Sequence, residues 1–290
     1  MEVMRYRWLA VIAVLAVGAF GSMPVARAHE GVPETPGTPP PIIARTIVYT
    51  FHGEALDTRH WHTIWHRGAG YGTAYPELQF YSPDAVTVER GVLHISASTY
   101  DQIDPESGFN YPFTSGRVES NDSYLYGRFN VRLKVPIGNG LWPSVWLRTP
   151  PARGPLGGQI DIYDGFGSHT DGFTASVASW ANGQVASSSC AIVENYAALT
   201  NCSRIGNPQR KPVNYSRDYH TFGIEWRPDH ITWYVDNKPY WTVTRGVPQV
   251  PMVLVMDLAV GGVQDGVPPA VQRHWRFPAD FEIASVAITR

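Results

Sequence analysis

Strict alternation of apolar and polar residues is the feature of this sequence that most restricts its fold. The segment Arg128–Val135 reads RFNVRLKV, and this period of two predicts a strand with one buried face. Ile231–Val235 has the same period, meets a turn at Asp236 and Asn237, and returns through Tyr240–Thr244 as a predicted hairpin. No segment has a convincing amphipathic helical period, so the pattern indicates a chain built almost entirely from strands.

Two further segments and the turn residues between strands define the fold class. Pro251–Val260 reads PMVLVMDLAV and is nearly all apolar, which predicts a central strand covered on both faces. Phe281–Ile288 is a further predicted strand. Gly, Pro and Asn turns separate the strands, and the sequence has no internal repeat of the kind found in propellers and β-helices. We therefore predict an all-β sandwich or jelly roll.

The N-terminal residues predict export. Arg5 and Arg7 precede an apolar run over Trp8–Phe20, and the small-x-small sequence Ala26–Ala28 follows as a cleavage site, so we predict a signal peptide over residues 1–28. The apolar run is shorter than the roughly 20 residues that span a bilayer. We expect a secreted or periplasmic protein that does not associate with the membrane after cleavage.

The rest of the chain is expected to form one domain. Residues 29–41 are rich in proline and predict an extended spacer, which leaves residues 42–290 for a single β-domain. The formal net charge is −2 without a Lys/Arg-rich stretch, which argues against a nucleic-acid partner, and we expect a monomer. Cys190 and Cys202 lie close in sequence in an exported chain and predict a disulfide, with two free thiols as the alternative.

Several segments, in their order along the chain, resemble glycoside hydrolase family 16. They are Tyr126–Pro136, Gly140–Leu147, Gly158–Asp164, Tyr219–Trp226 and Asp257–Gly262, and the resemblance covers nearly the whole predicted domain. It implies a jelly-roll β-sandwich of two curved antiparallel sheets, with a polysaccharide of the β-glucan or galactan class in the groove of the concave sheet. The ten Trp residues agree with this partner, because flat aromatic faces stack on sugar rings.

The catalytic signature of the resembled family is a Glu, an Asp two residues later and a second Glu five residues after the first. In this chain, these positions hold Gln159, Asp161 and Asp164. On a strand, positions 159 and 161 share a face, and position 164 returns to that face only if one extra residue forms a β-bulge. We therefore expect a bulge that points all three side chains into the groove.

The two substitutions predict altered chemistry. Family members that retain configuration use the first Glu as nucleophile and the last as acid and base, whereas the carboxamide of Gln159 has little nucleophilicity. Asp164 is one methylene shorter than Glu, which leaves its carboxyl on the order of 1.5 Å short. A neutral Gln159 is also expected to remove the charge repulsion that raises the proton affinity of the acid.

Further candidates come from the same resemblance. Trp142 and Trp146 match an aromatic pair beside the cleft, with packing in the core as the alternative, and Arg117 matches a position that reaches the substrate, with a solvated surface arginine as the alternative. His60, His62 and His66 do not form a convincing metal-binding pattern, so we predict no metal. No glycine loop leads from a strand into a helix, so we predict no cofactor.

Three functions remain open from the sequence. The first is a catalytically impaired or silent protein that binds a β-linked polysaccharide. The second is an active endo-glycosidase or transglycosylase with a modified catalytic pair, in which Asp161 or a group of the substrate replaces the nucleophile, or two carboxylates invert the configuration through a water. The third is a jelly-roll polysaccharide lyase, which needs a base in place of a nucleophile.

Overall fold

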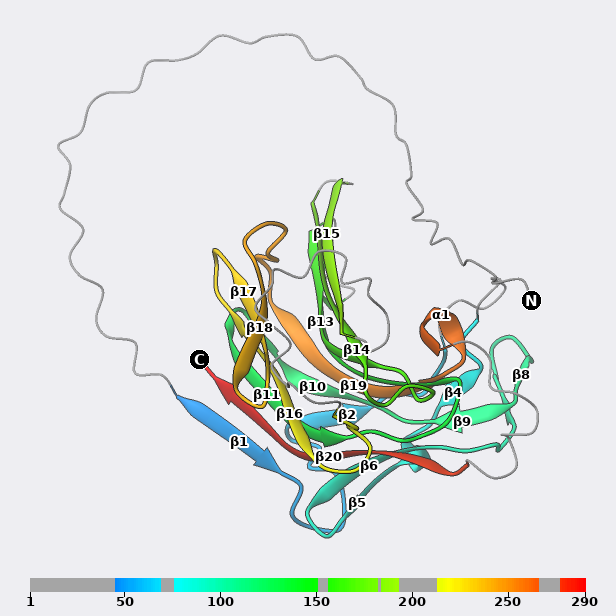
Figure 1. Cartoon of the computed structure of the whole chain (residues 1–290). Helices are drawn as coiled ribbons and strands as arrows, with labels where there is room; N and C mark the ends of the chain where they lie inside the picture. The colour runs from blue at the N-terminus through cyan, green and yellow to red at the C-terminus, as the bar shows by residue number, and fades with distance from the viewer. Residues whose placement is uncertain (1–44, 69–75, 151–155, 182–183, 193–212, 266–276) are drawn as a thin grey trace, which may run out of the picture. The chain divides into compact units, whose positions relative to one another are not determined.

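Strands make up most of the part of the chain that the structure describes, as the alternation predicts. The computed structural model describes residues 45–68, 76–150, 156–181, 184–192, 213–265 and 277–290 (Figure 1). The predicted signal peptide and spacer lie outside the described residues, and so does Cys202 of the predicted disulfide. None of the helices in the described part of the chain is long and apolar enough to span a lipid bilayer.

The larger sheet has eight strands. In order, its strands are β18 (Lys238–Val243), β17 (Ile231–Val235), β16 (His220–Trp226), β11 (Gly127–Lys134), β20 (Ala279–Thr289), β6 (Val92–Ala97) and β5 (Val86–Glu89), and β1 (Thr46–Thr50) pairs with β20 beside this series. Every pairing in it is antiparallel.

The second sheet has seven strands and carries the site described below. In order, they are β15 (Gln184–Ile192), β14 (Phe173–Ala181), β13 (Gly157–Gly165), β12 (Leu141–Arg148), β19 (Met252–Val260), β10 (Arg117–Tyr124) and β2 (Trp61–Thr63). All of its pairings are antiparallel. Several of its strands curve along their length, β19 most visibly (Figure 1).

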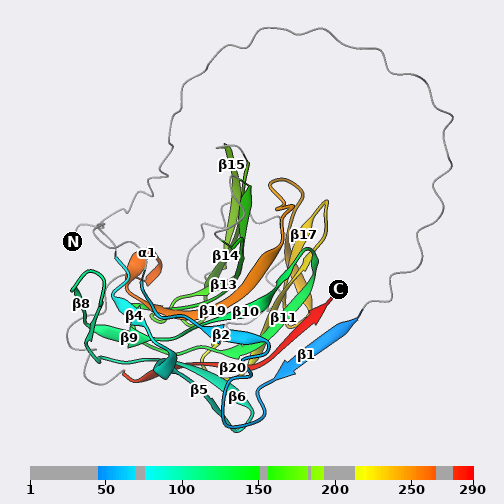
Figure 2. The ribbon, with the colours of Figure 1, turned by 180° about the vertical axis from the view of Figure 1, so that it is seen from behind.

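Smaller elements complete the described chain. They are a three-stranded sheet of β3 (His66–Arg67), β4 (Gln79–Tyr81) and β9 (Phe113–Ser115), a pair formed by β7 (Gln102–Ile103) and β8 (Asn110–Tyr111), the 3-10 helix η1 (Pro83–Ala85) and the helix α1 (Gly262–Asp265). Seen from both sides, β4, β8 and β9 lie near α1 and away from the β17–β18 hairpin (Figures 1 and 2).

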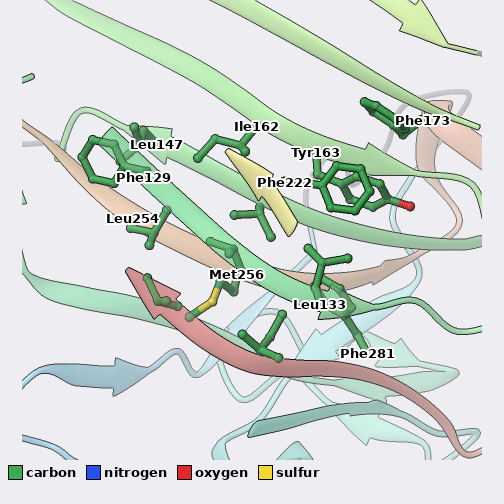
Figure 3. Close-up of a cluster of buried hydrophobic side chains, with 14 of the residues drawn as sticks. Phe129, Leu133, Leu147, Ile162, Tyr163, Phe173, Phe222, Leu254, Met256 and Phe281 are labelled. Atoms are coloured by element: carbon green, nitrogen blue, oxygen red, sulfur yellow. The ribbon is translucent and has the colours of Figure 1, made fainter. Parts of the chain in front are cut away.

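The core lies between the two large sheets, and the period of two explains how it forms. In β11, the side chains of Phe129, Val131 and Leu133 are fully buried and alternate with more exposed neighbours. Figure 3 shows Phe129 and Leu133 beside Leu254 and Met256 of β19, which belongs to the other sheet. Each sheet therefore contributes one apolar face to a shared interior.

The central strand and the hairpin were also predicted correctly. All nine residues of β19 are buried, and the strand lies between β12 and β10 in the seven-stranded sheet. The β17–β18 hairpin turns at Asp236 and Asn237, whose φ angles are 48° and 63°. Two successive left-handed residues are typical of a type I′ turn, which matches the twist of the paired strands.

Shortening Phe129 should destabilise the sandwich strongly. Its ring is fully buried and packs edge-on against Tyr124 of the opposite sheet, with ring centroids 5.5 Å apart. We expect Phe129→Ala to lower the free energy of unfolding by about 3–5 kcal/mol, because lost burial and the remaining cavity add. Urea denaturation measures the change, and Val48→Ala, at an exposed position of β1, should stay within about 0.5 kcal/mol of the unmodified protein. Equal effects of the two changes would contradict this assignment of the core.

Candidate active site

One pocket of about 680 Å³ lies on the outer face of the seven-stranded sheet. All six residues that the sequence predicted for a glycan site line it, and they come from β10, β12 and β13. These residues are Arg117, Trp142, Trp146, Gln159, Asp161 and Asp164. Trp142 and Trp146 are half-buried at its wall, so the structure places both beside the pocket rather than wholly in the core.

The predicted β-bulge is present in β13. Opposite it on β12, Val145 pairs with Tyr163 and Trp146 pairs with Asp161, so Ile162 is the extra residue. Ile162 and Tyr163 are both fully buried in the core, where Figure 3 shows their side chains. Two consecutive side chains therefore point inward, which returns Asp164 to the same face as Asp161.

The eight-stranded sheet holds the bulge from the core side. The indole Nε1 of Trp233, on β17, donates a 2.9 Å hydrogen bond to the backbone carbonyl of Asp161. The ring of Tyr163 packs against Phe222 of β16, with centroids 4.4 Å apart. Both partners are fully buried, so the backbone that carries the acidic residues is fixed by the interior of the protein.

Gln159 and Ser176 both donate hydrogen bonds to the carboxyl group of Asp161. The amide nitrogen Nε2 of Gln159 donates to Oδ1 of Asp161 at 2.7 Å, and the Ser176 hydroxyl donates to Oδ2 of the same carboxyl. Burial raises the pKa of Asp161, and these two hydrogen bonds oppose the rise. Gln159 thus presents a neutral carboxamide that is engaged with its neighbour.

Asp164 is held close to the floor of the pocket. Its Oδ1 accepts hydrogen bonds from Ser144 Oγ at 2.8 Å and from Trp142 Nε1 at 3.2 Å. Both donors belong to β12, which pairs with β13 at this point, so the carboxyl group is anchored to the neighbouring strand.

Burial and neighbours other than Gln159 set the proton affinity of Asp164. Burial raises the pKa of Asp164 well above its usual range, and the charge of Asp161 raises it further, while the hydrogen bonds from Ser144 and Trp142 only partly oppose this. The acid therefore keeps a high proton affinity although Gln159 is uncharged. Desolvation supplies the larger part and Asp161 supplies the neighbouring negative charge.

Sequence reasoning missed two carboxyl groups that line the pocket, Glu77 and Asp257, and the partners of Asp257. Asp257 of β19 is buried beside the same pocket and accepts hydrogen bonds from Tyr81 and Trp146, each 2.7 Å long. A signal was available, since Asp257 is the only charged residue in the apolar run Pro251–Val260. A lone acid in a buried strand needs polar partners and is a candidate for a functional site.

A charged cluster of Glu119, Arg117 and Arg148 lies beside Asp257. Glu119 of β10 is almost fully buried and forms ion pairs with Arg117 and Arg148, each with a shortest N–O distance of 2.6 Å. Although burial opposes it, the two guanidinium groups hold the pKa of Glu119 below its usual value. Among the described residues, no three His, Cys, Asp or Glu side chains are placed to hold a metal ion, although His66 lines the pocket.

Comparison with known proteins places this geometry in a family context. The model of the family described as Glycosyl hydrolases family 16 matches residues 79–276. Beta-glucanase from Rhodothermus marinus is 30% identical over 246 residues, which cover 76% of this chain and 77% of that protein. Glucan endo-1,3-beta-glucosidase A1 from Niallia circulans is 28% identical over 262 residues, which cover 79% of this chain but only 36% of that longer protein.

A solved structure resembles most of the chain. The X-ray structure of endo-beta-1,3-glucanase from Pyrococcus furiosus superimposes with a TM-score of 0.69 and 27% sequence identity. The match covers 85% of this chain and 94% of the other.

The raised pKa of Asp164 should make stability depend on pH. An unfolded aspartate has a pKa of about 3.9, so between that pH and the higher folded pKa the native state binds more protons than the unfolded state. The free energy of unfolding then falls as the pH rises. Asp164→Asn removes this loss, so the variant should gain stability relative to the unmodified protein between about pH 5 and pH 8.

Urea denaturation at a series of pH values measures this effect. Asp280→Asn, at an exposed position of β20, is the control for removing a carboxylate. A pH dependence that Asp164→Asn leaves unchanged would show that Asp164 is not held in its protonated form.

Proposed function

The chain belongs to glycosyl hydrolases family 16, and from this premise we propose that it binds a neutral β-glucan in the pocket without cleaving it efficiently. The observation that carries the proposal is the Gln159 carboxamide, which donates to Asp161 at the position where the resemblance expects a nucleophilic glutamate. Formation of a glycosyl–enzyme ester requires a carboxylate, which an amide cannot replace.

The remaining parts of the pocket support retained recognition. Trp142 and Trp146 offer aromatic surface, and Asp164, with its raised pKa, supplies a proton donor for a sugar oxygen. These groups suit binding of a sugar chain. They do not complete a double displacement, because that reaction requires a nucleophile to attack the sugar as well as protonation of the glycosidic oxygen.

The choice of β-glucan rests on the relatives. The proteins from Rhodothermus marinus, Niallia circulans and Pyrococcus furiosus are named as a beta-glucanase, a glucan endo-1,3-beta-glucosidase and an endo-beta-1,3-glucanase. We therefore propose β-1,3-linked glucan as the first ligand to test, ahead of the galactans that the sequence left open.

We also propose that the protein works outside the cytoplasm as a monomer. Arg5, Arg7 and the apolar run Trp8–Phe20 support export, and a polysaccharide ligand fits that location. In that oxidising environment, Cys190, which lies in β15, and Cys202 would form a disulfide.

Restoring the family's carboxylates should create hydrolysis. The mature unmodified protein should release no new reducing ends from β-1,3-glucan, Gln159→Glu should release some, and Asp164→Glu alone should release none. The double variant should exceed Gln159→Glu by about 100-fold, because a displacement of about 1 Å can cost that much in rate.

The control for this experiment is Gln184→Glu, which makes the same amide-to-acid change at an exposed position of β15 outside the pocket. It should remain inactive. Hydrolysis by the unmodified protein at the rate of the double variant would overturn the proposed loss of catalysis and would favour an active enzyme with a modified catalytic pair.

Binding should depend on the aromatic wall of the pocket. Trp142→Ala should weaken the Kd for a β-1,3-gluco-oligosaccharide about tenfold, equivalent to about 1.4 kcal/mol, because a stacking surface is lost. Trp65→Ala is the matched control, since Trp65 is half exposed but does not line the pocket. Calorimetry that finds equal losses in both variants, or no binding by the unmodified protein, would contradict the proposed ligand site.

A further inference from the structure

A straight row of polar residues crosses the floor of the pocket. Arg117 pairs with Asp257, Asp257 with Ser144, and Ser144 with Asp164, so the four residues lie directly opposite one another on β10, β19, β12 and β13. All four line the pocket. With neighbouring strands about 4.8 Å apart, the row is roughly 14 Å long, and Asp257 lies two strands away from Asp164. A sugar chain that crosses the strands therefore meets Asp257 at a second position.

At this second position, Asp257 accepts hydrogen bonds from two side chains, those of Trp146 and Tyr81. Its Oδ1 accepts the indole N–H of Trp146 and its Oδ2 accepts the hydroxyl of Tyr81, each at 2.7 Å. The Arg117 guanidinium lies 5.1 Å from the centroid of the Trp146 ring and 5.9 Å from that of Tyr81. Asp257 is 6% exposed, so these partners rather than water satisfy its oxygens.

The direction of one hydrogen bond sets the chemistry that a ligand meets. A tyrosine hydroxyl has a single proton, and Tyr81 gives it to Asp257, which leaves only lone pairs on the Tyr81 oxygen for other partners. Burial, and then the charge of Asp257, raise the pKa of Tyr81 well above its usual value, so the hydroxyl stays protonated. Tyr81 is only 3% exposed but lines the pocket, so its oxygen meets a ligand there as a hydrogen-bond acceptor.

Arg117 complements this acceptor. Its Nε and Nη2 donate to Oε1 of Glu119, at 2.9 and 2.6 Å, which fixes the plane of the guanidinium beside Trp146. A guanidinium has only donors, whereas the Tyr81 oxygen accepts, so the two together suit a sugar hydroxyl. An anionic sugar would bring its charge against the Asp257 carboxylate, and Arg117 is already paired with Glu119.

We propose that Asp257 is a positioning residue that determines ligand preference: it fixes Tyr81 as an acceptor and Trp146 as a wall, so that the second position takes a neutral sugar through a hydroxyl that donates to Tyr81. The inference rests on the proposed function and adds the chemical class of the sugar beside the one at Asp164. Asp257 acts through Tyr81 and Trp146 and does not need to touch the ligand.

Asp257→Asn isolates the direction of the hydrogen bond. An asparagine has nearly the same shape, and its carbonyl oxygen can still accept from Trp146. Its amide, however, would donate to the Tyr81 oxygen, which turns the Tyr81 proton toward the ligand and removes the acceptor. Tyr81→Phe removes the same acceptor directly, so the two changes should share one effect.

A double-mutant cycle tests the proposal. The Kd for a neutral β-1,3-gluco-oligosaccharide is measured by calorimetry for the unmodified protein, Asp257→Asn, Tyr81→Phe and the double variant, with Asp280→Asn as the control. Each single change should weaken binding about three- to tenfold, the range for one neutral hydrogen bond. The double variant should bind no more than about twofold more weakly than Tyr81→Phe, because both changes remove one interaction.

The outcomes distinguish the role of Asp257 from glucan binding itself. Independent, multiplying losses in the double variant, or an unchanged Kd in Tyr81→Phe, would overturn the role of Asp257 while leaving glucan binding intact. An unchanged Kd in Asp257→Asn would overturn that role as well, and if that variant does not fold, an unchanged Kd in Tyr81→Phe still does so. An unmodified protein that binds no glucan would overturn the proposed function and this inference with it.

Discussion

The chemistry of the pocket depends on one extra residue in one strand. Ile162 has no partner position on β12, so Ile162 and Tyr163 both enter the core, and Asp161 and Asp164 both face the pocket. At this bulge, the backbone carbonyl of Asp161 accepts a hydrogen bond from Trp233 of the opposite sheet. This bond holds the backbone in place. A regular strand would bury position 164 or turn it away from Gln159, and no combination of side chains could then bring the group together.

The sequence predicted the parts of the structure that local pattern controls. Alternation located the strands around Phe129, the apolar run located β19, and the spacing of positions 159, 161 and 164 required the bulge. No local pattern in the sequence predicted which distant segments pair with one another. Tyr81 meets Asp257 across 176 positions of sequence, and only the strand order places them together. The predicted signal peptide and the Cys190–Cys202 disulfide stay predictions.

Electrostatics was the other limit of sequence reasoning. From the residue types alone, replacing a charged neighbour by Gln159 removes repulsion and lowers the proton affinity of Asp164. In the folded pocket, the loss of water around Asp164 outweighs that change, and Asp161 provides the remaining charge. Burial is a property of the assembled sheets, so a pKa in such a site follows the environment more than the identity of one neighbour. A pocket can thus retain a protonated acid after its nucleophile position has lost its charge.

The central strand has a consequence for how this scaffold can change. Asp257 and Ala259 face the pocket, while Met256 and Leu258, their immediate neighbours in β19, fill the core. The same strand, β19, therefore carries residues for ligand recognition on one face and residues of the core on the other. A change of ligand preference at Asp257 or Ala259 thus also acts on the strand that carries the core residues Met256 and Leu258.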